Sequence, residues 1–288
     1  MYPAKFDYYR ASSVAEAVSL LQQHEDAKVL AGGHSLIPTM KLRLAQPPVI
    51  VDIGRISDLR GISESNGSIR IGALTTHATI ASSEVLQQKC RMMAEAAGLV
   101  GDPAVRHKGT IGGNIAHADP ASDLPAVVLA LGGTIHAAGP SGERQINASE
   151  FFIDLLTTAL QPNEILTAVE VPAASGRTGS AYLKFEHPAS GYALCGAAAV
   201  VTLAADGTCA SASLCFNGVT AKPLNASAVA SALSGKNLDD ATIDQAVNQS
   251  LSIDEPLGDI HASGPYRVEL AKTYGRRALK LARDRARG

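Results

Sequence analysis

The chain has 288 residues, a length that favours an organisation in two domains. Its 25 lysines and arginines against 27 aspartates and glutamates give a net charge of -2, which argues against a nucleic-acid-binding surface, because such a surface needs clustered cations. The N-terminus lacks the apolar stretch of a secretory signal, and no apolar run approaches the roughly 20 residues that span a bilayer. We therefore predict a cytoplasmic protein with no integral membrane segment.

The cysteine positions argue against a metal site, and the glycine positions indicate where a ligand could bind. No cysteine belongs to a CxxC pair or has metal-ligand spacing to a histidine, so we interpret all four as buried apolar residues and expect no metal site in this chain. Only 4% of the residues are aromatic, whereas glycine occurs 26 times. Because glycine allows backbone segments to approach closely, the glycine positions carry the more useful signal.

The first predicted unit, about residues 1–55, contains a helix, a strand, a glycine loop and a second strand. Ser13 and Glu16 form a capping box, and the helix that follows has one apolar face, formed by Val14, Val18 and Leu21. The strands are expected at 28–31, which leads into the glycine loop, and at 49–53.

The rest of the chain alternates strands and helices. From about residue 56 to 176 we predict strands at 68–74 and 164–171, helices from about residue 77 and at 91–99 and 124–131, and a polar, glycine-rich stretch at 101–123. Residues 172–180 are small and are typical of a linker. Beyond it, an antiparallel sheet is expected from strands at 181–186, 194–203 and 209–216, followed by helices at 226–233, 240–251 and 266–285.

Two glycine pairs carry the main chemical signal. The first lies in Ala31-Gly32-Gly33-His34-Ser35 and the second in Thr110-Ile111-Gly112-Gly113-Asn114. Neither matches the GxGxxG dinucleotide fingerprint or the GxxxxGK(S/T) phosphate loop. Consecutive backbone N–H groups unshielded by a Cβ form nests for anionic oxygens, and two nests suit a pyrophosphate. The alternative is that each pair only makes a tight turn.

The same two segments resemble the FAD-binding loops of the flavin-carrying medium subunit of molybdenum hydroxylases. This family includes carbon monoxide dehydrogenases, N-heterocycle and nicotine dehydrogenases, and the flavin domain of xanthine dehydrogenase. The resemblance covers essentially the whole chain, through FDYYRASSVAEAVSLL, IGALTTHATI, DPAVRHKGTIGGNIAHADPASDLPA and YLKFEHPASGYA. Each loop alone is moderately specific, and both in this order are strongly so.

The resemblance implies an α+β fold of the vanillyl-alcohol-oxidase type. A PCMH-type FAD-binding domain would occupy residues 1–176, built from two α+β subdomains at about 1–55 and 56–176. A C-terminal α/β domain of the CO dehydrogenase flavoprotein type would occupy residues 177–288.

The resemblance also implies cofactor-binding residues. The pyrophosphate and neighbouring parts of FAD would lie among Ala31, Gly32, Gly33, His34, Ser35, Leu36, Thr110, Ile111, Gly112, Gly113 and Asn114. Asp123 would contact the adenosine side, with a helix N-cap as the alternative. Lys184 would lie near the flavin ring, or else face outward from a strand. Tyr192 would also lie near the ring, or else pack in the core.

In function, the resemblance implies the FAD-binding electron-transfer subunit of a heterotrimeric molybdenum hydroxylase, without catalytic acid–base residues of its own. Electrons would come from [2Fe-2S] clusters on a small iron-sulfur subunit. The substrate, CO or an N-heterocycle such as nicotine, caffeine or quinoline, would be oxidised on a large subunit with molybdenum-molybdopterin cytosine dinucleotide. We expect a dimer of heterotrimers that passes electrons to an external acceptor. The alternative is a stand-alone FAD-dependent reductase or oxidase of the same flavin fold.

Overall fold

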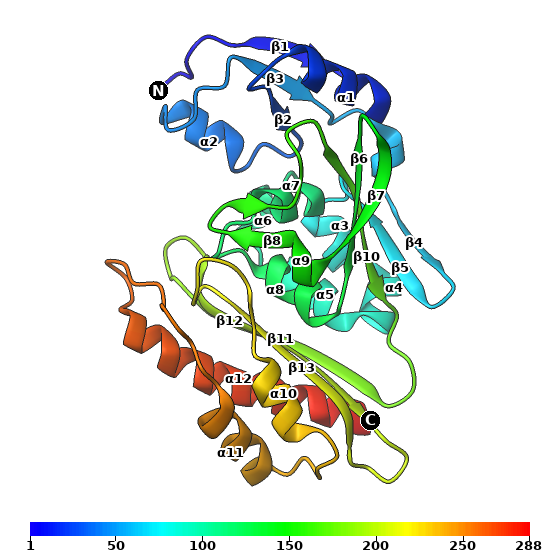
Figure 1. Cartoon of the computed structure of the whole chain (residues 1–288), viewed down its shortest axis with the longest axis vertical. Helices are drawn as coiled ribbons and strands as arrows, with labels where there is room; N and C mark the ends of the chain where they lie inside the picture. The colour runs from blue at the N-terminus through cyan, green and yellow to red at the C-terminus, as the bar shows by residue number, and fades with distance from the viewer.

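The computed structural model describes all 288 residues, and its three main sheets follow one another along the long axis (Figure 1). The first is a small parallel sheet of order β1-β3-β2, with helix α1 packed on it. Its unit consists of β1 (Asp7–Arg10), α1 (Val14–Gln23), β2 (Lys28–Leu30), α2 (Leu36–Lys41) and β3 (Val49–Asp52).

The middle unit is built on a five-stranded antiparallel sheet of order β4-β5-β10-β6-β7. Its strands are β4 (Ile62–Ser65), β5 (Ser68–Gly72), β6 (Thr134–Gly139), β7 (Gly142–Asn147) and β10 (Ile165–Pro172), with the small pair β8 (Phe152–Asp154) and β9 (Thr157–Thr158) beside them. Its helices are η1 (Ser57–Leu59), α3 (His77–Ala81), α4 (Glu84–Lys89), α5 (Arg91–Gly98), α6 (Pro103–Arg106), α7 (Ile111–His117), α8 (Asp123–Ala130) and α9 (Ala148–Phe151).

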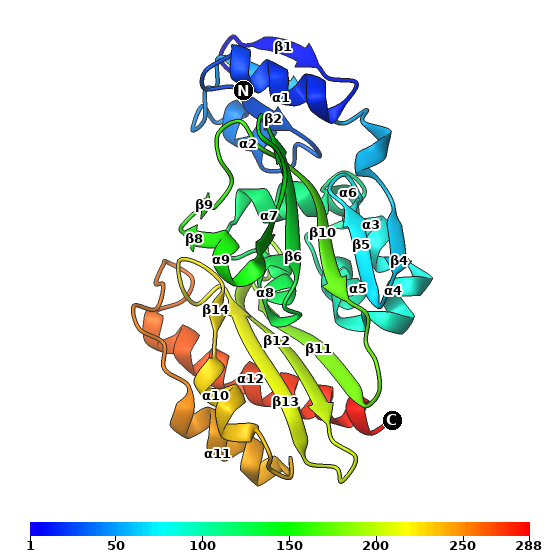
Figure 2. The same ribbon diagram turned by 45° about the vertical axis from the view of Figure 1, so that its right-hand side comes forward.

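The third sheet is antiparallel, of order β11-β12-β13-β14, and lies between two layers of helices (Figure 2). It is formed by β11 (Thr178–Glu186), β12 (Ala193–Leu203), β13 (Cys209–Asn217) and β14 (Leu224–Asn225), followed by α10 (Ser227–Leu233), α11 (Asp240–Ser250) and α12 (Gly264–Arg287). Alternate strand residues point to opposite faces. Tyr182 therefore joins the core of the middle unit, whereas its neighbour Ala181 packs toward α10–α12.

Glycine explains how closely α12 lies on its sheet. A Cβ at Gly179 of β11 would stand 2.1 Å from the carbonyl oxygen of Ala282, and one at Gly275 of α12 would stand 2.9 Å from the Phe216 ring. Both positions therefore exclude any larger side chain. All four cysteines are buried, as interpreted from the sequence. No helix combines the length and the apolar character that crossing a bilayer requires.

Each predicted strand and helix matches an observed one to within a few residues. Outside 101–123, the sequence prediction missed the strands β1, β4, β6 and β7 and the helices α2 and α4. The capping box at α1 is displaced by one residue on one side: Ser13 accepts from the Glu16 N–H, but the Glu16 carboxylate accepts from Ser12. The stretch 101–123, which was not predicted to be helical, contains α6 and α7. The second glycine pair thus lies in the first turn of a helix.

Candidate functional site

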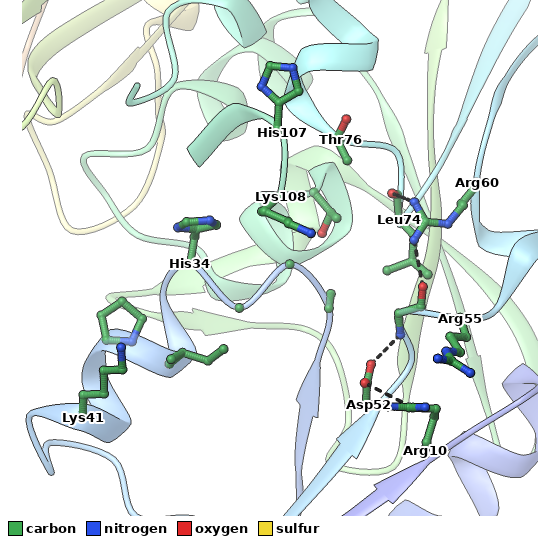
Figure 3. A pocket seen from close by; sticks show the side chains of 17 residues that line it. Arg10, His34, Lys41, Asp52, Arg55, Arg60, Leu74, Thr76, His107 and Lys108 are labelled. Carbon is green, nitrogen blue, oxygen red and sulfur yellow. Dashed lines mark hydrogen bonds and ion pairs between the residues drawn. The ribbon is translucent and has the colours of Figure 1, made fainter. Parts of the chain in front are cut away.

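A cleft of about 690 Å³ opens where the first unit meets the middle unit, within the size range of ligand sites (Figure 3). Its walls come from the loop after β2, from α2, from the end of β3 and from the segment that precedes α7. The lining residues are Arg10, Ala31, Gly32, Gly33, His34, Ile37, Pro38, Lys41, Asp52, Gly54, Arg55, Arg60, Leu74, Thr76, His107, Lys108 and Thr110.

The first glycine loop presents free backbone donors to this cleft. None of the N–H groups from Ala31 to Ser35 makes a hydrogen bond within the protein, and Gly33 has a left-handed φ of 77°. The chain then enters α2, whose Ile37 N–H donates to the Gly33 carbonyl at 3.0 Å. A row of free amides around a left-handed residue is an anion-binding nest. The free amides expected at the first loop are present, and the binding of an anion by them stays a prediction.

The second glycine loop is different, and the prediction of a second nest there was wrong. The Gly112 N–H donates to the Ala73 carbonyl at 2.8 Å, and the Gly113 N–H donates to Oγ1 of Thr110 at 3.2 Å, as the cap of α7. A Cβ at Gly112 would stand 2.5 Å from the Cβ of Ala73, so close packing requires glycine at this position. Ile111 is fully buried in the core. Of the five residues, Thr110 alone lines the cleft.

The two loops nevertheless contact each other directly. A Cβ at Gly32 would stand 2.2 Å from the Lys108 carbonyl oxygen and 2.9 Å from the Gly109 Cα. Gly32 is therefore required for the approach of the loops as well as for an open nest.

The charge in the cleft favours an anion. Lys41, Arg55 and Lys108 lie around the first loop without an ion pair or a side-chain hydrogen bond to the protein (Figure 3). The single carboxylate, Asp52, already accepts from the Gly54 N–H at 2.7 Å and lies 3.8 Å from Arg10. Five free amides and three unpaired cations thus converge on a space with no free carboxylate. Sequence reasoning missed the cations, although Lys41 lies eight positions after the first glycine pair and Lys108 four positions before the second.

Asp123 and Lys184 form a buried ion pair. The Lys184 Nζ lies 3.2 Å from Oδ1 of Asp123, and the two side chains are 2% and 6% exposed. Tyr182 donates to the same carboxylate at 2.6 Å. Burial raises the pKa of Asp123 to about 6, although the Lys184 charge and the Tyr182 hydrogen bond lower it. The contact of Asp123 with the adenosine side and the place of Lys184 near the flavin ring stay predictions.

The structure excludes the alternative placements that the sequence analysis gave for Lys184, Asp123 and Tyr192. Lys184 does not face outward, and Asp123 is the first residue of α8, after Ser122 at the N-cap position. Tyr192 is 48% exposed, which excludes the core-packing alternative.

The structure also places the remaining polar residues near the two loops. Asn114 accepts from Ser122 at 2.8 Å, and Ser35 and Leu36 begin α2 beside the cleft. His34 lines the cleft, whereas His117 ends α7 outside its lining.

His77, which the sequence marked only as the start of a helix, supports the second loop. Its N–H donates to the Gly109 carbonyl at 3.1 Å, and a Cβ at Gly109 would stand 2.9 Å from its ring. The ring is buried and its Nδ1 has no partner. Burial, helped by the charges of Arg106 and His34, lowers the pKa of His77 to about 4.

We expect His77 to make the fold acid-labile. A histidine whose folded pKa lies below its unfolded value of 6.5 contributes stability above pH 6.5 that is lost as the pH falls toward 4. The loss amounts to about 3 kcal/mol in the free energy of unfolding. Urea unfolding between pH 7.5 and 4 should therefore show a smaller decrease for His77→Gln than for the unaltered chain. His261→Gln, the same exchange at an exposed position, is the matched control, and equal decreases in all three proteins would contradict this role.

Comparison with known proteins agrees with this geometry. Residues 4–174 match the family described as the FAD binding domain in molybdopterin dehydrogenase, and residues 180–282 match the CO dehydrogenase flavoprotein C-terminal domain. The chain belongs to this family of FAD-binding medium subunits of molybdenum hydroxylases, and it has the α+β fold that the resemblance implied.

Individual relatives cover the chain from end to end. The carbon monoxide dehydrogenase medium chain of Afipia carboxidovorans is 40% identical over 288 residues, 100% of both chains. The 6-hydroxypseudooxynicotine dehydrogenase complex subunit alpha of Paenarthrobacter nicotinovorans is 35% identical over 100% of this chain and 97% of its own. A solved carbon monoxide dehydrogenase from Hydrogenophaga pseudoflava superposes with a TM-score of 0.95 at 40% identity, covering 99% of each chain.

Proposed function

We propose that this chain binds FAD in the cleft, with the pyrophosphate on the free amides of Ala31 to Ser35. The observation that carries the proposal is the convergence of these amides with Lys41, Arg55 and Lys108, none of which has a partner in the protein. The amides give directional donors, and the cations compensate the charge of the two phosphates. The Thr110 hydroxyl lines the same cleft and can donate a further hydrogen bond.

In this proposal the chain is the electron-transfer subunit of a heterotrimeric molybdenum hydroxylase. FAD, when bound, supplies the redox chemistry that joins a one-electron donor to an external acceptor. The residues of this chain bind and orient it, and Tyr192 borders its ring. The partners are a small subunit with [2Fe-2S] clusters and a large subunit with molybdenum-molybdopterin cytosine dinucleotide, assembled as a dimer of heterotrimers in the cytoplasm.

The named relatives support the general role and leave the substrate open. They include a carbon monoxide dehydrogenase medium chain and a subunit of a 6-hydroxypseudooxynicotine dehydrogenase, at 40% and 35% identity. Such different substrates on similar medium chains agree with a substrate site on another subunit. We propose CO or an N-heterocycle as the substrate class.

We also propose that the FAD-binding domain spans residues 1–176 and the C-terminal domain residues 177–288. The matched ranges of the two families, 4–174 and 180–282, support this boundary. So does the short segment between β10 and β11, which leaves one sheet and enters another.

The test is a visible absorption spectrum of the protein purified with its companions, followed by acid release of the chromophore. We expect FAD, iron–sulfur absorbance and two companion chains. Flavin on a single, active chain would replace the proposal by the stand-alone reductase or oxidase. A colourless chain that takes up no added FAD would contradict the assignment of the cleft.

A further inference from the structure

The wall of the cleft that α2 forms continues outward as an exposed surface, residues 37–44, which we call the α2 ridge. Ile37, Pro38 and Lys41 line the cleft and are exposed. Just beyond them, Leu42 and Leu44 are 59% and 78% exposed. A single exposed leucine is ordinary, but apolar side chains that stand together beside a ligand cleft indicate a surface that another molecule covers.

The backbone holds the two leucines of the α2 ridge outward. Arg43, which lies between them, has a left-handed φ of 59°. The Arg43 N–H donates to the Met40 carbonyl at 3.0 Å, and the Leu44 N–H donates to the Thr39 carbonyl at 2.9 Å, which closes the turn. Met40, two positions before Leu42 and thus on the opposite side of the chain, is buried. The exposure of both leucines is therefore fixed by hydrogen bonds and by the buried side of α2.

The start of the chain extends this apolar surface. Nε of Arg43 lies 3.5 Å from the carbonyl oxygen of Tyr2, and the N-terminus lies beside α2 in both views (Figures 1 and 2). Both Met1 and Tyr2 are exposed. Together with Ile37, Leu42 and Leu44, they make up five of the fourteen large apolar residues that are exposed in the whole chain. The exposed apolar surface is thus concentrated beside the cleft.

The charge of the α2 ridge is positive. Lys41 and Arg43 form no ion pair, and residues 37–44 contain no aspartate or glutamate. The complementary surface is therefore apolar with negative charge. A [2Fe-2S] cluster held by cysteine thiolates is itself an anion, since its thiolates and sulfides outweigh the charge of its iron ions. An iron–sulfur protein thus matches the α2 ridge in charge.

We propose that the α2 ridge is the docking surface for the small iron–sulfur subunit. The inference rests on the proposed function, because it requires FAD in the cleft and an iron–sulfur subunit as the electron donor. A donor has to be positioned beside the cofactor that it reduces, and α2 is a wall of the cleft that continues outward as apolar surface. The small subunit is expected to place apolar side chains on Leu42 and Leu44 and a carboxylate on Arg43.

The test is a titration of the full chain with the small subunit. L42S/L44S removes both apolar side chains of the turn, and we expect the dissociation constant of the small subunit to rise at least about tenfold. The matched control is L155S/L156S, the same exchange at two half-exposed leucines in the turn between β8 and β9 of the middle unit. This control should bind the small subunit as the unaltered chain does.

A second variant separates docking from folding. Arg43→Gly removes the cation at a left-handed position that glycine adopts without strain, so the unfolding temperature should stay the same or rise. The dissociation constant of the small subunit should nevertheless rise roughly two- to fivefold, the size of one exposed ion pair. The remaining binding should also depend less on salt concentration, because one charge pair is lost. A purely structural role of Arg43 would not produce this combination.

Other results would assign the α2 ridge to a different occupant or to none. Unchanged affinity of L42S/L44S for the small subunit would overturn the inference. So would a co-purified L42S/L44S complex that loses the large subunit and keeps the small one. An unaltered chain that forms a dimer by itself, and a monomer after L42S/L44S, would place a second copy of the chain on the ridge and would also overturn it. An unaltered chain that binds no FAD, or no small subunit, would instead contradict the proposed function.

Discussion

A chain with Gly32→Ala is expected to lose its FAD. The added Cβ would stand 2.2 Å from the Lys108 carbonyl oxygen, far inside contact distance, and both neighbours are backbone atoms that cannot rotate away. The two loops must separate, which moves the free amides of the first loop away from Lys108 and Thr110. We expect the FAD dissociation constant to rise at least about tenfold, equivalent to 1.4 kcal/mol, in a fluorescence titration.

Two further glycine exchanges make this experiment specific. Gly98→Ala adds the same atom at the end of α5, where the nearest neighbour is the Ala81 Cβ at 3.8 Å, and should bind FAD normally. Gly113→Val adds a Cβ 3.0 Å from Oγ1 of Thr110, which lines the cleft, and 3.8 Å from the Ala31 Cβ, and should also reduce FAD retention. Full occupancy in both Gly32→Ala and Gly113→Val would remove the glycine loops from the cofactor site.

The first loop could be predicted from the sequence because its geometry is local. A short strand leads into two glycines, and a left-handed residue beside free amides needs only the neighbouring residues to form. The strands and helices that were predicted depend on equally local signals, since apolar periodicity and caps act within one or two turns. Strands such as β6 and β7, which form a hairpin in the middle sheet, were missed. The resemblance added the identity of the cofactor, which no local pattern carries.

The errors in the site come from long-range contacts. The Gly112 N–H is occupied because it donates to the carbonyl of Ala73, which lies 39 positions earlier in the chain. Ala73 directly follows the end of strand β5. Asp123 and Lys184, 61 residues apart, pair because α8 packs on the third sheet, in which β11 carries Lys184. His77 is buried because Gly109 lacks a side chain. None of these partners follows from the spacing or composition of the segment concerned.

Breaking the Asp123–Lys184 pair from one side should destabilise the protein in a pH-dependent way. Lys184→Met leaves a buried carboxylate without its cation, for which a loss of about 3–5 kcal/mol in the free energy of unfolding is typical. The loss applies only when Asp123 is ionised. Its folded pKa, about 6, already lies above the unfolded value of 3.8 because of burial, and removing Lys184 raises that pKa further.

The direction of this pH dependence follows from the linkage between proton binding and folding. An acid whose folded pKa exceeds its unfolded value binds its proton more tightly in the folded state, so stability falls as the pH rises from 3.8 through the folded pKa. Lys184→Met should therefore lose much more stability at pH 8 than at pH 5, measured by urea unfolding. In D123N/K184M no charge remains to be buried, and most of the loss at pH 8 should be recovered. The Lys184 ammonium also donates hydrogen bonds to the carbonyls of Leu99 and Gly191. If Lys184→Met lost the same stability at both pH values, these hydrogen bonds, and not the Asp123 charge, would explain the loss.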